Sequence, residues 1–398
     1  MKTVSQIWKE NQAWVDATFA KLDKKLRLMS ARSGKKIVDG IDENGRHKEI
    51  KPIEWTSGFW GGLNAMMYEH TKEQVYLDCA KYSEEKLDEA LFGDYEALYH
   101  DVGFMWDILS GVLYRITGDK QSRNRLLWAA AVLASRINID GKFMHAWNGN
   151  HVQNLTIIDT MMNLPTLFRA SKELGNDRFA RLAMMQADMA MQQHVRADGS
   201  VYHQIEHDRE TGRALTFEEL PIGRASEGSV LPEYGGQGYS FESSWSRGQG
   251  WAVYGFTLAY MHCGEQRYLD TAIKVADYVI ENVKNDWLPK IDFRAPAEPV
   301  YYDSTAGMIY ACAFVELAKL LGEEKGAKYM EAAINLLRAA EAAFADWNDE
   351  TDQIMSHGSV LYPLNEWRKK TVHISIIYGD YYFAEALIKL RGSDFLTW

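Results

Sequence analysis

Cysteine and long apolar runs are scarce in this chain of 398 residues. Its 3 cysteines, Cys79, Cys263 and Cys312, lie far apart, and no CxxC pair or Cys/His cluster occurs. A disulfide framework and a zinc site are therefore not expected, and a reducing cytoplasm is the compartment that we predict. No run of roughly 18 apolar residues is present, so we predict no membrane-spanning segment.

Basic residues are fewer than acidic ones. The 44 Lys and Arg residues stand against 55 Asp and Glu, a net charge of −11. Nucleic-acid binding needs a basic face, so no nucleic-acid partner is expected. An anionic small substrate stays possible, because one or two local arginines can override the net field. Residues 1–26 lack the apolar core of a signal peptide and predict an amphipathic helix. The sequence gives no indication of the oligomeric state.

Apolar residues recur at three- and four-residue spacings along most of the chain, which predicts helices. Gly118, Gly175, Gly264 and Gly322 mark short turns between successive helices. Six helical hairpins predict an all-α fold, an (α/α)6 barrel, and 1–398 forms a single domain because no Pro/Ser-rich linker divides it. The competing architecture is an α-solenoid, which would expose a long groove. The predicted helices are 5–29, 58–72, 74–90, 100–117, 119–136, 154–173, 175–195, 246–262, 264–284, 303–322, 324–346 and 375–391.

The connections between these helices alternate between short and long. The long ones precede every second helix and hold most of the Trp, His, Gly and Asp residues. If helices alternate between an outer and an inner ring, all long loops emerge at one end and form an aromatic-lined pocket there. Residues 196–245 alternate like short strands, and we expect a small β-like insertion over that mouth.

Two aspartates are the candidate catalytic groups. Asp159 lies within an apolar run of helical length, where an unpaired carboxylate would be costly, so it must be paired, hydrogen-bonded or functional. Asp101 precedes the neighbouring inner helix, where a plain N-cap is the alternative interpretation. Two carboxylates close together cannot both ionise easily, so one keeps its proton toward neutral pH, as general acid/base catalysis requires.

Other side chains at the same end suit an acidic sugar. Arg247, in the sequence WSRGQGW, is a candidate clamp for a carboxylate, because a guanidinium binds one through two hydrogen bonds. Indoles can stack on sugar rings, and amide or imidazole groups can bond hydroxyls. Neither a nucleotide motif (GxGxxG or GxxxxGK[ST]) nor a GxSxG nucleophile elbow is present. The candidate side chains are Trp55, Trp147, Trp251, Gln237, His100 and His203.

Over residues 10–392 the chain resembles glycoside hydrolase family 88, the unsaturated glucuronyl hydrolases. The motifs that carry this resemblance are WTSGFW (55–60), HDVGFM (100–105), DTMMNLP (159–165), SSWSRGQGWAVYGF (243–256) and YGDYYF (378–383).

The resemblance implies an (α/α)6 barrel that needs no metal or other cofactor. Its implied substrates are glycosaminoglycan disaccharides left by polysaccharide lyases from chondroitin, hyaluronan or heparin, with a 4,5-unsaturated uronate at the non-reducing end. Asp159 matches the family's general acid/base and Asp101 its assisting aspartate. The positions that match the sugar subsite are Trp55, Phe59, Trp147, His203, Gln237, Arg247, Trp251 and, on a looser match, Tyr362.

The chemistry that the resemblance implies is hydration of a vinyl ether rather than attack at the anomeric carbon. Protonated Asp159 would donate to carbon 4, and water deprotonated by the same group would add to carbon 5. The hemiketal then opens and the aglycone leaves. Near the C-terminus, where some members recognise a sulfate, this chain instead has Asn365 to Lys370. Arg368 and Lys370 could meet a sulfate there, or belong to a solvated charge run.

Three other functions are compatible with the sequence. An unsaturated rhamnogalacturonyl hydrolase would use the same chemistry on pectin fragments. A sugar 2-epimerase on the same barrel would need histidine bases, for which His100, His203 and His373 are available. A carbohydrate-binding scaffold would explain the indoles and Arg247, but not a buried Asp159.

Overall fold

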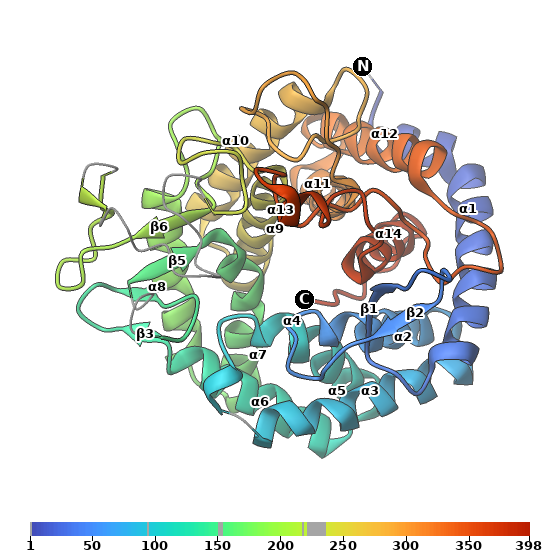
Figure 1. Cartoon of the computed structure of the whole chain (residues 1–398), viewed down its shortest axis with the longest axis horizontal. Coiled ribbons are helices and arrows are strands. Elements are labelled where there is room, and N and C mark those ends of the chain that lie inside the picture. Colours follow the sequence, from blue (N-terminus) through green and yellow to red (C-terminus); the bar gives the residue numbers. More distant parts are fainter. Residues whose placement is uncertain (1, 94, 150–153, 217–218, 221–235) are drawn as a thin grey trace.

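A computed structural model describes residues 2–93, 95–149, 154–216, 219–220 and 236–398. Its helices form two concentric rings (Figure 1). The outer ring consists of α1 (Val4–Ser33), α3 (Gln74–Gly93), α6 (Lys120–Ala134), α8 (Arg178–Gln193), α10 (Gln266–Val283) and α12 (Ala327–Phe344). The inner ring consists of α2 (Ser57–Thr71), α4–η2–α5 (Val102–Trp106, Asp107–Gly111, Val112–Thr117), η4–α7 (Ile158–Asn163, Leu164–Leu174), α9 (Ser246–Cys263), α11 (Ser304–Lys325) and α14 (Ile377–Leu390).

The inner ring closes on itself. Each inner helix packs against the next one along the chain, and α14 packs against both α11 and α2. The outer ring closes too, because α1 lies against α3 and α12. A closed ring is a barrel and not a solenoid, so the predicted (α/α)6 fold is confirmed.

The burial of each helix follows its ring. From Ser304 to Ala318 every residue of α11 is buried, as a helix surrounded by other helices requires. By length and composition α11 could also cross a membrane, but 78% of its apolar window is buried inside the protein, as in an ordinary core helix. Outer helices such as α10 bury one face only.

Short turns join each inner helix to the outer helix that follows it. Gly118, Gly175 and Gly264 end α5, α7 and α9 in the left-handed conformation, which glycine adopts without steric cost. Near the end of α11, Gly322 interrupts the helical backbone with φ 75° and ψ −175°, a different conformation that glycine also adopts readily. The glycine turns predicted from the sequence are therefore present, and they leave all the long connections at the opposite end.

The long connections carry the short elements. Within the described ranges they hold three antiparallel strand pairs and the short helices η1 (Tyr95–Ala97) and α13 (Glu366–Lys369), neither of which the sequence predicted. Within 196–245, only the part outside 217–218 and 221–235 is described. It contributes one strand and the isolated bridges of Val195 with Val201 and His207 with Ala214, so the strand-like expectation is met there. The pairs are β1 (Val38–Ile41) with β2 (His47–Glu49), β3 (Ile137–Asn138) with β4 (Phe143–Met144), and β5 (Leu155–Ile157) with β6 (Gln204–Glu206).

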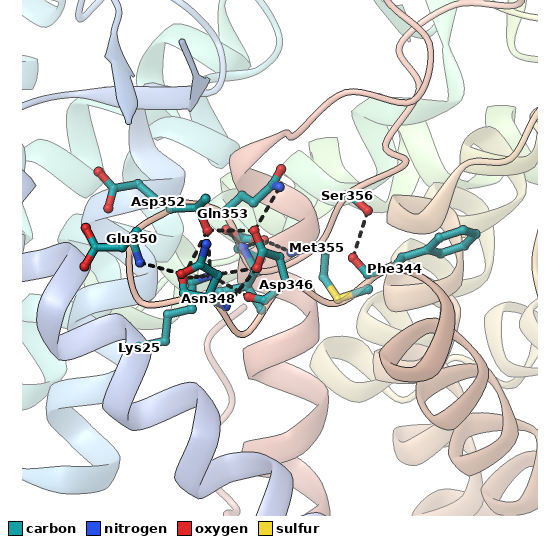
Figure 2. A network of polar contacts seen from close by, with 12 residues as sticks. Lys25, Phe344, Asp346, Asn348, Glu350, Asp352, Gln353, Met355 and Ser356 are labelled. Carbon is teal, nitrogen blue, oxygen red and sulfur yellow. Dashed lines mark hydrogen bonds and ion pairs between the residues drawn. The ribbon is translucent and has the colours of Figure 1, made fainter. Parts of the chain in front are cut away.

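The connection 345–376 is anchored to α1 by a buried lysine (Figure 2). The ammonium of Lys25 donates to the carbonyl oxygens of Asp346 and Asn348 and to the hydroxyl of Thr351. On the other side of this turn, the Asp380 carboxylate of α14 accepts the backbone N–H groups of Ile354 and Met355. These bonds fix the start of a segment that continues to the site.

Candidate active site

The two predicted aspartates come from adjacent inner segments and meet at the end with the long loops. Asp101 directly precedes α4 but makes no capping hydrogen bond, so the plain N-cap interpretation fails. Asp159 lies in η4, and each carboxyl side chain is only 10% exposed. The amide of Asn163 contacts both residues, with its nitrogen 3.5 Å from Asp101 Oδ1 and 3.3 Å from the carbonyl oxygen of Asp159.

One histidine stands beside each aspartate. His203 Nε2 is 3.4 Å from Asp159 Oδ1, and His100 Nε2 is 3.4 Å from Asp101 Oδ2. The backbone N–H of Gln237 donates to His203 Nδ1, so the proton of a neutral His203 is on Nε2 and faces Asp159. Neither of the two 3.4 Å contacts has hydrogen-bond geometry, and Asp159 Oδ1 has no hydrogen-bond partner. Asp159 Oδ1 and both Nε2 atoms are therefore buried polar atoms that lack a hydrogen-bond partner among the described residues.

The electrostatics of the pair keep a proton on it. Burial first, and the charge of Asp159 second, raise the pKa of the Asp101 carboxyl well above its usual value. Burial lowers the pKa of His100 to about 3, so this imidazole is neutral and does not offset the pair's charge. The predicted retention of a proton by one of two neighbouring carboxyls therefore has a physical basis, and the proton belongs to the pair as a unit.

Aromatic side chains form the interior next to the aspartates. Phe104, three residues after Asp101, contacts Trp55, Phe59 and Trp251, with ring centroids 5.1–5.5 Å apart. Phe59 and Trp251 have no exposed surface, so their predicted direct contact with a sugar is corrected: they pack beneath the site. Trp55 is only half-buried and keeps surface for a ligand.

Trp147 lies next to His100, the histidine beside Asp101. Its ring is half-buried and meets His100 edge to face, with centroids 6.3 Å apart. Of the three predicted indoles, Trp55 and Trp147 therefore remain candidates for stacking on a sugar.

Arg247 occupies a different role from the free anion clamp that the sequence predicted. Its side chain is 1% exposed and pairs with Asp303 at 3.2 Å. The same guanidinium donates to the carbonyls of Ser359 and Val360, and to Gln237 Oε1 at 2.9 Å. The terminal nitrogens of Arg247 are therefore engaged within the protein. Its bond to Gln237 Oε1 fixes the side-chain amide of Gln237 and leaves the N–H groups of that amide as donors.

Of the C-terminal candidates, Tyr362 lies next to Gln237. Its backbone N–H donates to the backbone carbonyl of Gln237, and its ring packs against Tyr239 with centroids 5.1 Å apart. Arg368 is buried in α13, whereas Lys370 directly after it is exposed. The solvated-run interpretation is therefore wrong for Arg368. For Lys370 the two interpretations stay open.

Two further positions complete the comparison with the sequence. His373, a base in the epimerase hypothesis, accepts the backbone N–H of Tyr302 through Nε2 and is thus tied to a loop. Asn163 was not among the predicted site residues, although its position four residues after Asp159 places it one helical turn away. Among the described residues no group of three or more His, Cys, Asp or Glu side chains is placed to hold a metal ion.

Known proteins resemble this chain in both sequence and fold. Residues 30–217 match the model of Glycosyl Hydrolase Family 88. The chain is 30% identical to the unsaturated glucuronyl hydrolase of Bacillus sp. (strain GL1), over 91% of this chain and 94% of that protein. It is also 30% identical to the unsaturated chondroitin disaccharide hydrolase of Streptococcus pneumoniae, over 87% of this chain and 84% of the relative.

The crystal structure of the Bacillus sp. GL1 unsaturated glucuronyl hydrolase superposes with a TM-score of 0.82 at 28% identity, covering 94% of this chain and 96% of that one. Fold and site thus define an (α/α)6 barrel with a buried carboxyl pair, the architecture of a glycoside hydrolase. The chain belongs to glycosyl hydrolase family 88, the family of the unsaturated glucuronyl hydrolases.

Proposed function

We propose that the protein hydrolyses unsaturated glycosaminoglycan disaccharides: it hydrates the vinyl ether double bond of the 4,5-unsaturated uronate, which is released as an open-chain keto acid. The observation that carries this proposal is the buried Asp101–Asp159 pair, which holds a proton and faces an unsatisfied imidazole N–H. The relatives named for glucuronyl and chondroitin disaccharide substrates support the substrate class.

The reaction begins with protonation of carbon 4 by a neutral carboxyl. We assign the donation to Asp159, because His203 Nε2–H stands beside its Oδ1 and stabilises the carboxylate that donation leaves. The pair shares its proton, so the proton must lie on Asp159 at the moment of donation. Positive charge then develops at carbon 5, next to the ring oxygen.

Water completes the reaction. It adds to carbon 5 while the Asp159 carboxylate takes one of its protons, which restores the acid. The hemiketal at carbon 5 opens by breaking its bond to the ring oxygen, so that carbon 5 becomes a ketone. Carbon 1 is then a hemiacetal, and its collapse to an aldehyde expels the aglycone with a proton. One water is consumed in total, and no metal ion enters any step.

The substrate's carboxylate and second sugar have separate partners. Gln237, with its carbonyl held by Arg247, offers its amide N–H groups to the uronate carboxylate. Lys370 is exposed after α13 and meets a sulfate or second carboxylate on the neighbouring sugar, with Arg368 of the same helix beside it. This basic end of α13 is what makes sulfated disaccharides acceptable substrates in our proposal.

Ultraviolet absorbance tests the proposed function, because hydration destroys the conjugated double bond. We expect decay of an unsaturated chondroitin disaccharide with release of the amino sugar. Decay only with an unsaturated rhamnogalacturonan disaccharide would move the protein to pectin fragments, and no decay with either would contradict the reaction.

Sulfated substrates test the role of Lys370. The Lys370→Gln variant should raise KM for a sulfated disaccharide and leave the unsulfated one unchanged. Lys369→Gln is the matched control, since Lys369 is paired with Glu366. Equal effects of the two substitutions would contradict the assignment.

We further propose that the enzyme acts in the cytoplasm on imported disaccharides, in line with three cysteines that are all free thiols. Cell fractionation followed by immunodetection tests this placement, and recovery outside the cytoplasm would contradict it.

A further inference from the structure

A cluster of two histidines and one threonine is attached to the strand pair β5–β6. It takes no part in the mechanism above. Thr156 of β5 is fully buried, and its hydroxyl oxygen is 2.9 Å from His194 Nε2 and 2.8 Å from His207 Nε2. His194 follows the last residue of α8, and His207 follows β6 directly. One hydroxyl thus joins three segments of the chain.

The tautomers of both rings follow from their other nitrogens. His194 Nδ1 is 2.9 Å from the carbonyl oxygen of Tyr202, and His207 Nδ1 is 3.1 Å from that of Gly212. A carbonyl only accepts, so each Nδ1 carries a proton and each Nε2 presents a lone pair to Thr156. Burial lowers the pKa of His194 to about 3 and that of His207 to about 4, so both rings are neutral near pH 7.

The hydroxyl is therefore the only hydrogen-bond donor that either lone pair meets within the cluster. It has a single proton, and a third acceptor, the Ile205 carbonyl, is more distant at 3.5 Å. The hydroxyl can therefore donate to only one of the two nitrogens at a time. A side chain without a hydroxyl at position 156 would remove this one hydrogen bond and leave both buried nitrogens facing an apolar group, which costs free energy.

The cluster is connected directly to the two groups that face each other in the site. Thr156 lies three residues before Asp159. His194 exchanges two hydrogen bonds with Tyr202, the residue before His203: its Nδ1–H donates to the Tyr202 carbonyl, and the Tyr202 N–H donates to the His194 carbonyl. The Ile158 N–H also donates to the carbonyl of His203, at 2.9 Å. The position of β5 against His194 thus sets where Asp159 and His203 stand.

The contact between His203 and Asp159 is sensitive to small movements. His203 Nε2 and Asp159 Oδ1 are 3.4 Å apart, just outside a good hydrogen bond. A movement of a few tenths of an ångström closes this contact, whereas an opposite movement removes the imidazole from the carboxylate. Misplacement of a catalytic group by about 1 Å can lower a rate by about 100-fold.

We propose that Thr156 and His194 are positioning residues that hold Asp159 and His203 at their working separation. They act through the β5–β6 pair and touch neither the carboxylate nor a bound sugar. The inference rests on the proposed function for its kinetic test. It predicts a larger change in kcat than in KM, because the Asp159–His203 pair carries out the proton transfer, whereas the proposed contacts with the uronate carboxylate and the second sugar lie on other segments.

The test compares Thr156→Val, which keeps the shape and removes the hydroxyl, with Thr156→Ser, which keeps the hydroxyl. Thr156→Val should lower kcat by roughly 10-fold or more with KM within about 3-fold, and Thr156→Ser should restore kcat to within about 3-fold of wild type. Thr257→Val is the matched control, since it removes a fully buried hydroxyl that bonds only the Val253 carbonyl of its own helix.

Three results would overturn the proposal: unchanged kcat in Thr156→Val, no recovery in Thr156→Ser, or an equal loss in Thr257→Val. If Thr156→Val does not fold, Thr156→Cys replaces it, because a thiol is a weak donor of similar size, and the same loss of kcat is expected.

A measurement without substrate separates this inference from the proposed function. The ¹⁵N chemical shifts of the His203 imidazole should differ from wild type in Thr156→Val and not in Thr257→Val. If wild type hydrolyses no unsaturated disaccharide, the proposed function fails, and these shifts still decide the inference. Unchanged His203 shifts in Thr156→Val would contradict it.

Discussion

The buried guanidinium of Arg247 makes a prediction that separates its structural from its ligand-binding role. Replacing Arg247 by Met removes the ion partner of Asp303, whose side chain has no exposed surface. Removing one member of a buried ion pair costs about 3–5 kcal/mol, because the other charge stays buried and uncompensated. Asp303 would keep its bonds from Thr305 and from the Ser359 N–H, which places the expected cost at the lower end, about 3 kcal/mol.

Thermal unfolding with substrate kinetics measures this effect. Each kcal/mol lowers the Tm by at most about 2–4 °C in a chain of this size. Arg247→Met should therefore lower the Tm by several degrees, and also raise KM because the carbonyl of Gln237 is no longer held. The double variant Arg247→Met/Asp303→Asn should recover part of the Tm and none of the KM. A variant Arg247→Met with the Tm of wild type and a raised KM would refute this reasoning and restore the arginine as a direct anion clamp.

Three other substitutions test the architecture around the site. Burial raises the pKa of Asp380 to about 7. The folded protein therefore holds a proton that the unfolded chain loses near pH 4, and stability should increase by up to about 4 kcal/mol as the pH falls from above 7 to 4. Denaturant titrations should show that Asp380→Asn lacks this pH dependence, and an increase of the wild-type contribution with pH would contradict it. Asn163→Leu should lower kcat by roughly 100-fold, because the Asn163 amide contacts both aspartates. The circular dichroism spectrum should stay that of a folded barrel. A kcat near wild type would count against the role of Asn163. Lys25→Met should lower the free energy of unfolding by about 3 kcal/mol in denaturant titrations, because three oxygens lose a buried donor. A loss below about 0.5 kcal/mol would show that the start of the connection 345–376 does not depend on Lys25.

Most of the fold could be predicted because the barrel repeats one pattern. Apolar spacing gave the twelve helices, and glycines such as Gly118 and Gly264 gave the turns between them, since a left-handed residue ends a helix regardless of its partners. The π-helix Asp107–Gly111 inside the second inner segment was not predictable, because its extra residue follows from packing: Asp107 pairs with the buried Arg169 of α7.

Many residues of the site could be predicted from the sequence, but fewer of their contacts could. Asp159 stood out because a carboxylate in an apolar run needs a partner or a function. The role of Arg247 could not be read from the sequence, since its partners Asp303 and Ser359 come from two distant loops. The burial of Trp251 depends likewise on Phe104 of another helix. Long-range contacts of this kind are set by the closed ring rather than by local pattern.

The most direct test of the central claim follows absorbance and sugar release together, in wild type and in Asp159→Asn, on one unsaturated chondroitin disaccharide. The account predicts that wild type loses one double bond for each amino sugar released. It also predicts that Asp159→Asn binds the disaccharide with a Kd close to the wild-type KM and turns it over at least roughly 1,000-fold more slowly. Amino sugar released with the double bond intact, or full turnover by Asp159→Asn, would contradict the assignment of Asp159 as the acid that starts the hydration.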